Sequence, residues 1–70
     1  MFVKDDSKKL GENLKEIRLS KGIKQVEIAK ILGVDRSFVS NLEKGKTNPT
    51  LSTIKRIADA LGVSVDRLLK

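Results

Sequence analysis

Side chains that could do chemistry gather between Gly33 and Gly45, in the segment GVDRSFVSNLEKG. Drawn as a helix with Val39 and Leu42 facing inward, this segment presents an outer face without acidic side chains. The outer face consists of Arg36, Ser37, Ser40, Asn41 and Lys44. Arginine can donate to both acceptors of guanine, asparagine can pair with the edge of adenine, and serine can donate or accept. The pattern favours contact with base edges in a DNA groove, although a solvated helix face is also polar.

Enzyme chemistry has few candidate residues in this chain of 70. The absence of histidine and cysteine excludes histidine-based triads, disulfides and the usual zinc ligands. Ser20 and Lys21 are neighbours in sequence, and neighbouring helical residues do not face each other, so we expect no serine–lysine pair. We therefore expect no enzyme, no metal site, no cofactor and no small-molecule ligand.

The net charge of the chain is +6, from 15 lysines and arginines against 9 aspartates and glutamates. A basic balance favours nucleic acid or another anionic partner, although many small proteins are basic for solubility alone. No segment reaches the roughly 18 apolar residues of a membrane span, and the N-terminus lacks the apolar core of a signal peptide. We expect a cytoplasmic protein that makes no membrane contact.

Helical spacing interrupted by turn residues predicts an all-α domain of five short helices over residues 7–70. Residues 1–6 are expected to be a flexible tail. The first helix is expected from about Ser7 to Gly22, on an apolar stripe of Leu10, Leu14 and Ile17. The others are expected at about 25–32, 36–44, 51–61 and 65–69.

The predicted helix starts differ in the quality of their capping residues. Asp35, Thr50 and Ser64 can each accept a hydrogen bond from the backbone of the helix that follows. Lys24 is a poor cap, and we expect Glu27 to reach back to the chain in its place.

The second and third helices, over residues 25–44, have the spacing of a helix-turn-helix. Ala29 is small where two steeply crossing helices approach, and Gly33 supplies the positive φ of the turn. Apolar residues fill the space between the helices at Ile28, Leu32, Val34, Val39 and Leu42.

The segment LKEIRLSKGIKQVEIAKILGVDRSFVSNLEKGKTNPTLSTIKRIADALGVSVDRLL, from Leu14 to Leu69, resembles the phage-repressor-like helix-turn-helix family, also called the xenobiotic-response-element family. Within it, DRSFVS is similar to the recognition helix of restriction–modification controller proteins. The resemblance implies a compact, five-helix, lambda-repressor-like fold that binds double-stranded DNA. It also implies a homodimer on a near-palindromic operator, and a transcriptional regulator that we expect to be a repressor.

The family positions that face bases match Arg36, Ser37 and Asn41, and Ser40 lies on the same face. For Arg36 the alternative is a phosphate contact or a surface ion pair. Phe38 is expected either at the edge of the core or on a thymine methyl group.

Phosphate contacts are expected at the start of the second helix and in the loop after the third. A helix N-terminus attracts phosphate, and the resemblance implies that the side chain of Gln25 joins it. The expected loop contacts are Lys44, Lys46, Thr47 and Asn48.

Two further sets of residues are given structural roles by the resemblance. Arg18 and Glu43 match an ion pair within the fold. The apolar side chains of the last segment could close the core or meet a second copy, and the resemblance favours a dimer interface. These side chains are Val63, Val65, Leu68 and Leu69.

Two alternatives to a specific regulator stay open. The same scaffold could serve as a protein-interaction module, such as an antitoxin or an adaptor. Nonspecific nucleic-acid binding would show no base preference and a steep dependence on salt. The chain is either a minimal regulator or the DNA-binding piece of a longer protein.

Overall fold

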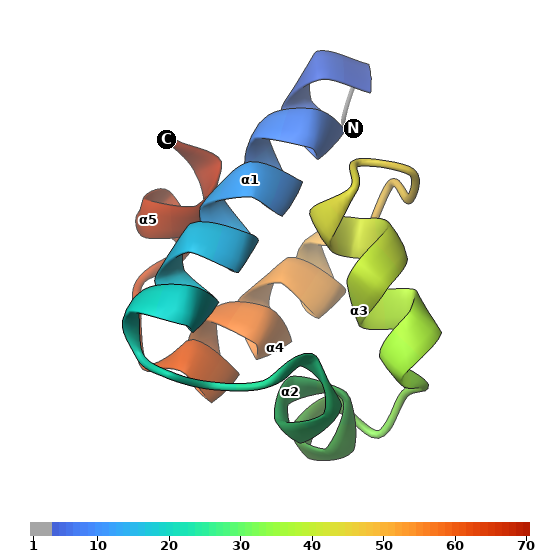
Figure 1. Ribbon diagram of the computed structural model, residues 1–70. Helices are drawn as coiled ribbons and strands as arrows, with labels where there is room; N and C mark the ends of the chain where they lie inside the picture. The colour runs from blue at the N-terminus through green and yellow to red at the C-terminus, as the bar shows by residue number, and fades with distance from the viewer. Residues whose placement is uncertain (1–3) are drawn as a thin grey trace.

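The computed structural model describes residues 4–70, and this range contains five α-helices and no strand. The helices are α1 (Lys4–Ser20), α2 (Gln25–Leu32), α3 (Arg36–Glu43), α4 (Leu51–Leu61) and α5 (Val65–Leu69). In Figure 1, α1 passes between α5 and α3, and α2 lies below α3. The expected all-α, five-helix fold is confirmed.

The start of α1 differs from the prediction. The helix begins at Lys4 and not near Ser7, so residues 4–6 belong to the helix and not to a tail. Residues 1–3 of the predicted tail lie outside the described part of the chain. The apolar stripe that predicted this helix begins only at Leu10, so it carries no signal for the earlier start. An acidic residue such as Asp6 in the first turn is favourable beside the helix dipole.

Three of the four predicted cap interactions are present. Thr50 accepts from the backbone N–H of Thr53 at 3.2 Å, and Ser64 accepts from that of Arg67 at 3.4 Å. At Lys24, the backbone N–H donates to Glu27 Oε1 at 2.8 Å, as expected. Asp35 occupies the N-cap position of α3, but its side chain makes no capping hydrogen bond, so that part of the prediction is wrong.

One buried core unites all five helices. Its members are Leu10, Leu14, Ile17, Ile28, Ala29, Leu32, Val39, Leu42, Ile54, Ile57, Ala58, Leu61 and Leu68. Gly33 ends α2 with a φ of 72°, which lets Val34 donate from its backbone to Ala29 and turn toward α3. The left-handed turn at Gly33 and the burial of Ala29 therefore agree with the spacing.

The C-terminal helix requires a correction. Leu68 is 0% exposed within the monomer, so it closes the core and cannot form part of a dimer surface. Val63 and Val65 are partly buried against the same core, whereas Leu69 is 39% exposed. In a helix, Val65 and Leu68 lie three residues apart on one face, and that face is the one turned inward.

Close approach of α1 to α3 depends on a residue that the spacing analysis passed over. Gly11 is buried in the middle of α1, and a Cβ placed there would overlap the backbone carbonyl oxygens of Leu42 and Glu43. A Cβ on Gly45 would lie 2.8 Å from the Cα of Lys8. Gly11 and Gly45 therefore allow α1 to pack closely against the end of α3 and the turn that follows it.

Candidate nucleic-acid interface

The outer face of α3 is arranged as the helical geometry predicts. Val39 and Leu42 are buried, at 0% and 1% exposure, and they orient the helix. The polar residues point away from the core: Arg36, Ser37, Asn41 and Lys44 are exposed and Ser40 is partly exposed. The single acidic residue within α3, Glu43, is only 8% exposed. The face is therefore rich in hydrogen-bonding groups and free of exposed carboxylates.

Phe38 is partly buried and packs against the hydrophobic core. This packing favours the core-edge interpretation of Phe38 over a contact with a thymine methyl group.

Arg18 and Glu43 form the ion pair that the resemblance implies. Arg18 Nε donates to Glu43 Oε2 at 2.6 Å, and Nη2 donates to Oε1 at 3.1 Å. The third nitrogen, Nη1, donates to the carbonyl oxygen of Ile23 at 2.8 Å. Both residues are less than a tenth exposed. The pair therefore connects α1 with the last turn of α3 and with the loop that leads into α2.

Gln25 extends this pair toward the outer face of α3. Its Nε2 donates to Glu43 Oε1 at 2.9 Å, and its Oε1 accepts from Arg36 Nη1 at 3.1 Å. Sequence reasoning assigned separate roles to these residues and missed their connection. Arg36 is 11 positions from Gln25 and Glu43 is 18 positions from it. Gln25 lies on α2 and the other two lie on α3, so no periodicity within one helix links Gln25 to either.

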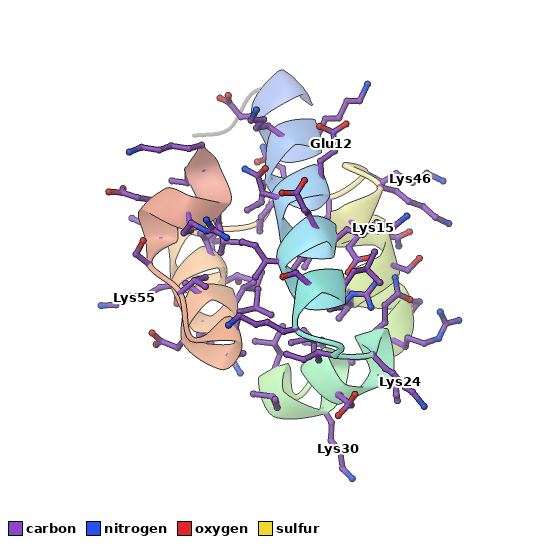
Figure 2. The ribbon with its side chains drawn as sticks, turned by 60° about the vertical axis from the view of Figure 1, so that its left-hand side comes forward. Glu12, Lys15, Lys24, Lys30, Lys46 and Lys55 are labelled. Carbon is purple, nitrogen blue, oxygen red and sulfur yellow. The ribbon has the colours of Figure 1, made fainter. Side chains whose placement is uncertain are left out.

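Four of the five residues predicted to contact phosphate, all but Gln25, line an open depression of about 550 Å³ beside the end of α3. Its walls are Ser7, Lys44, Gly45, Lys46, Thr47 and Asn48. Ser7, which the sequence analysis did not single out, is buried and its Oγ donates to Asn48 Oδ1 at 3.5 Å. Figure 2 shows Lys46 and Lys24 extending outward on the side of α3, and Lys55 extending on the opposite side. Lys44 belongs both to this depression and to the outer face of α3, so the two adjoin.

A second open depression has a volume of about 540 Å³, and its walls are Asn13, Glu16, Ile17, Ser64, Asp66, Arg67 and Lys70. Among residues 6–70, whose side chains the structure describes, no group of three or more acidic side chains is placed to hold a metal ion. No helix in the same range has the length and apolar character to cross a membrane.

The five-helix fold and the polar outer face of α3 together define a helix-turn-helix protein. A family model described as Helix-turn-helix, HTH_3, matches residues 14–68, and the chain belongs to this family.

Individual relatives are regulators by name. The chain is 45% identical over 60 residues to the SPbeta prophage-derived uncharacterized HTH-type transcriptional regulator YonR of Bacillus subtilis, covering 86% of this chain and 56% of YonR. It is 33% identical over 60 residues to the immunity repressor protein of Bacillus phage phi105, covering 86% of this chain and 42% of the repressor. The chain thus spans about half the length of these two relatives.

A solved structure matches over nearly its whole length. The restriction–modification controller protein C.AhdI from Aeromonas hydrophila superposes with a TM-score of 0.85 at 38% identity. The match covers 91% of this chain and 97% of C.AhdI. The similarity to a controller protein agrees with the subgroup suggested by DRSFVS.

Proposed function

We propose that this protein is a sequence-specific, DNA-binding transcriptional regulator that acts as a repressor. The observation that carries the proposal is the outer face of α3, which is polar and has no exposed carboxylate. The names of the relatives, which include an immunity repressor, support regulation and repression. The relatives named above are regulators and not enzymes by name, and we propose that this protein is not an enzyme.

In the proposed complex, α3 enters the major groove. Base edges contact Arg36, Ser37, Ser40 and Asn41, and the phosphate backbone contacts Gln25, Lys44, Lys46, Thr47 and Asn48. Contacts to phosphate position the protein on the duplex, whereas contacts to base edges specify the sequence. The depression beside α3 supports this division, because its lysines and short polar side chains suit an anionic backbone.

We further propose a homodimer that binds two inverted half-sites. Leu69 is the most exposed of the four residues first assigned to the interface, and Val63 and Val65 lie partly exposed nearby in sequence. A two-fold dimer of this kind of motif binds half-sites centred about one helical turn apart.

Selection from randomised duplexes, read by sequencing, tests the function directly. The proposal predicts enrichment of two inverted half-sites at that spacing. Enrichment of no sequence, with binding that salt abolishes, would contradict it. That outcome would favour nonspecific nucleic-acid binding. The absence of any binding to DNA would favour the protein-interaction alternative, for which α2 offers the exposed apolar side chains Val26 and Ile31.

Two substitutions then test the division of labour. Arg36→Ala should relax the preference at one base position per half-site, because a bidentate arginine–guanine contact contributes about 1–3 kcal/mol of discrimination. Lys46→Ala should weaken binding to all duplexes alike and reduce the slope of log affinity against log salt by about one unit. Affinities measured across a salt series on matched and mismatched duplexes distinguish the two. Identical behaviour of the two variants would contradict the assignment.

A further inference from the structure

The depression beside the end of α3 has one wall that comes from outside the helix-turn-helix. Most of its residues belong to the segment 44–48, whereas Ser7 belongs to α1. The backbone of α1 comes close to this segment at Gly45, where an added Cβ would lie 2.8 Å from the Cα of Lys8. Ser7 also precedes residues 14–68, which match the family model. The depression therefore joins a residue of α1 to the loop that follows α3.

The walls of the depression have the chemistry of an anion-binding site. Lys44 and Lys46 are exposed and cationic, and none of the described residues that line the depression is acidic. Lys46 extends outward in Figure 2. Thr47 is partly buried, and within the described part of the chain its N–H and hydroxyl groups make no hydrogen bond. An anion in the depression would therefore meet positive charge and donors that are not already in use.

The hydroxyl group of Ser7 is a further donor, and its present hydrogen bond is long. Ser7 is only 4% exposed, and among the described residues its Oγ has Asn48 Oδ1 as its partner, at 3.5 Å. Hydrogen bonds between a hydroxyl group and an oxygen are usually about 2.5–3.0 Å long. Burying a hydroxyl group without a good partner costs free energy, so most buried hydroxyl groups have a closer one. Ser7 therefore retains most of its capacity to donate.

A phosphate oxygen is the kind of acceptor that this hydroxyl group lacks. Hydrogen bonds to a charged oxygen are shorter than those between neutral groups and roughly twice as strong. The hydroxyl hydrogen can rotate toward a new acceptor, and the backbone need not move. Because Ser7 is almost fully buried, little water competes for the bond. Exchange of the Asn48 amide oxygen for a phosphate oxygen is thus favourable for Ser7.

We propose that Ser7 of α1 binds one phosphodiester group of the DNA backbone in this depression, together with Lys46 and Thr47. The inference rests on the proposed function only because it requires binding to DNA, since a contact with phosphate does not depend on the base sequence. It extends the DNA interface from the helix-turn-helix onto α1. Contacts with phosphate fix the register of a protein on the duplex, so Ser7 helps to place α3 in the groove.

The first test compares the affinities of Ser7→Ala and Ser20→Ala for duplex DNA across a salt series. Ser7→Ala should weaken binding to every duplex about fivefold per half-site, as expected for the loss of one hydrogen bond to a charged group. The slope of log affinity against log salt should not change, because serine neutralises no phosphate. Ser20 is an exposed serine of the same helix whose Oγ donates to the carbonyl oxygen of Ile17, and Ser20→Ala should change neither quantity. Unchanged affinity in Ser7→Ala would overturn the inference.

A purely structural role for Ser7 is tested in the free protein. Since the bond to Asn48 is long, Ser7→Ala should leave the urea midpoint and the backbone amide spectrum of residues 44–48 nearly unchanged. A loss of DNA affinity that accompanies a rearranged loop in the free variant would overturn the inference. Ser7 would then support the loop without contacting phosphate.

Single methylphosphonates in the selected operator locate the contact. Each of them replaces one charged phosphate by a neutral group. At one position per half-site Ser7→Ala should cause no further loss of affinity, because the contact is already removed, and at the other positions its full effect should remain. Equal effects of Ser7→Ala at every position would overturn the inference. If the unaltered protein binds duplexes but selects no sequence, the proposed function fails, and the first test still decides the role of Ser7. If it binds no duplex, both fail.

Discussion

Arg18 and Glu43 are charged residues in a place where water scarcely reaches, and each depends on the other for neutralisation. Their side chains are 8% and 3% exposed and share two hydrogen bonds. Removing one member of a buried pair leaves the other charge buried without its partner, which typically costs about 3–5 kcal/mol. Arg18→Met should therefore lower the free energy of unfolding, measured by urea denaturation, by that order.

The controls for this prediction come from the same helix and the same pair. Lys15→Met changes an exposed residue of α1, drawn in Figure 2, and should alter stability by no more than about 0.5 kcal/mol. The double variant Arg18→Met/Glu43→Leu should be less destabilised than the sum of its single variants, because neither charge is then stranded. Strict additivity would show that the two charges do not depend on each other.

Individual residues also show where sequence reasoning stops. Val39 and Leu42 predicted the inward side of α3, and with it the exposure of Ser37 and Asn41, because helical periodicity is local. The contact of Gln25 with Arg36 depends on how two helices cross, and this is set by packing that no spacing within one helix encodes. The Arg18–Glu43 pair came from the family resemblance and not from the residues alone.

At the scale of elements, the contact between α1 and α3 depends on the missing side chain of Gly11. Replacing a helical glycine by alanine normally gains about 1 kcal/mol of helix propensity. Here the added Cβ would overlap backbone carbonyl oxygens of α3, which cannot rotate away as the end of a side chain could. Gly11→Ala should therefore destabilise the protein, by about 1–3 kcal/mol as overpacked sites usually do.

Gly62→Ala provides the comparison for Gly11. Gly62 has a φ of 71°, and a Cβ there would meet no atom within 4 Å. Its substitution should cost only the backbone strain of a left-handed alanine, roughly 1–2 kcal/mol. Thermal and urea unfolding measure the loss of stability in both variants. Affinity for the selected operator should fall more for Gly11→Ala than for Gly62→Ala, because only the change at Gly11 displaces α3. A Gly11→Ala protein as stable as the original would show that α1 and α3 can separate freely.

The helices themselves were largely predictable, because their ends carry local chemical signals. Thr50 and Ser64 cap α4 and α5, and glycines end α2 and α4 in the left-handed conformation, as the sequence indicates. The failures occurred where the local signal was absent or misleading. The start of α1 precedes its apolar stripe, and Asp35 occupies a cap position without making the cap hydrogen bond.

At the scale of the whole molecule, the sequence left one question open. The apolar side chains of the last segment could close the core of the monomer or contact a second copy of the chain. The structure divides them: Leu68 is completely buried, whereas Leu69 remains 39% exposed. Asn13 strengthens the inward attachment, since its Nδ2 donates to the carbonyl oxygen of Leu68 at 2.7 Å and ties α5 to α1. Periodicity could not make this division, because Leu68 and Leu69 are adjacent on a helix of only five residues.

Adjacent leucines thus provide a matched test of the proposed dimer. Leu69→Lys should weaken self-association, observed by sedimentation velocity, and leave the unfolding of the monomer nearly unchanged, because a lysine is tolerated at an exposed site. Leu68→Ala should instead lower the free energy of unfolding by about 2–5 kcal/mol, as buried leucine truncations do. The loss of dimer in Leu69→Lys should also reduce affinity for a two-half-site duplex far more than affinity for a single half-site, because only the former uses both copies. If Leu69→Lys sediments as the unaltered protein does, a dimer must form through a surface other than α5.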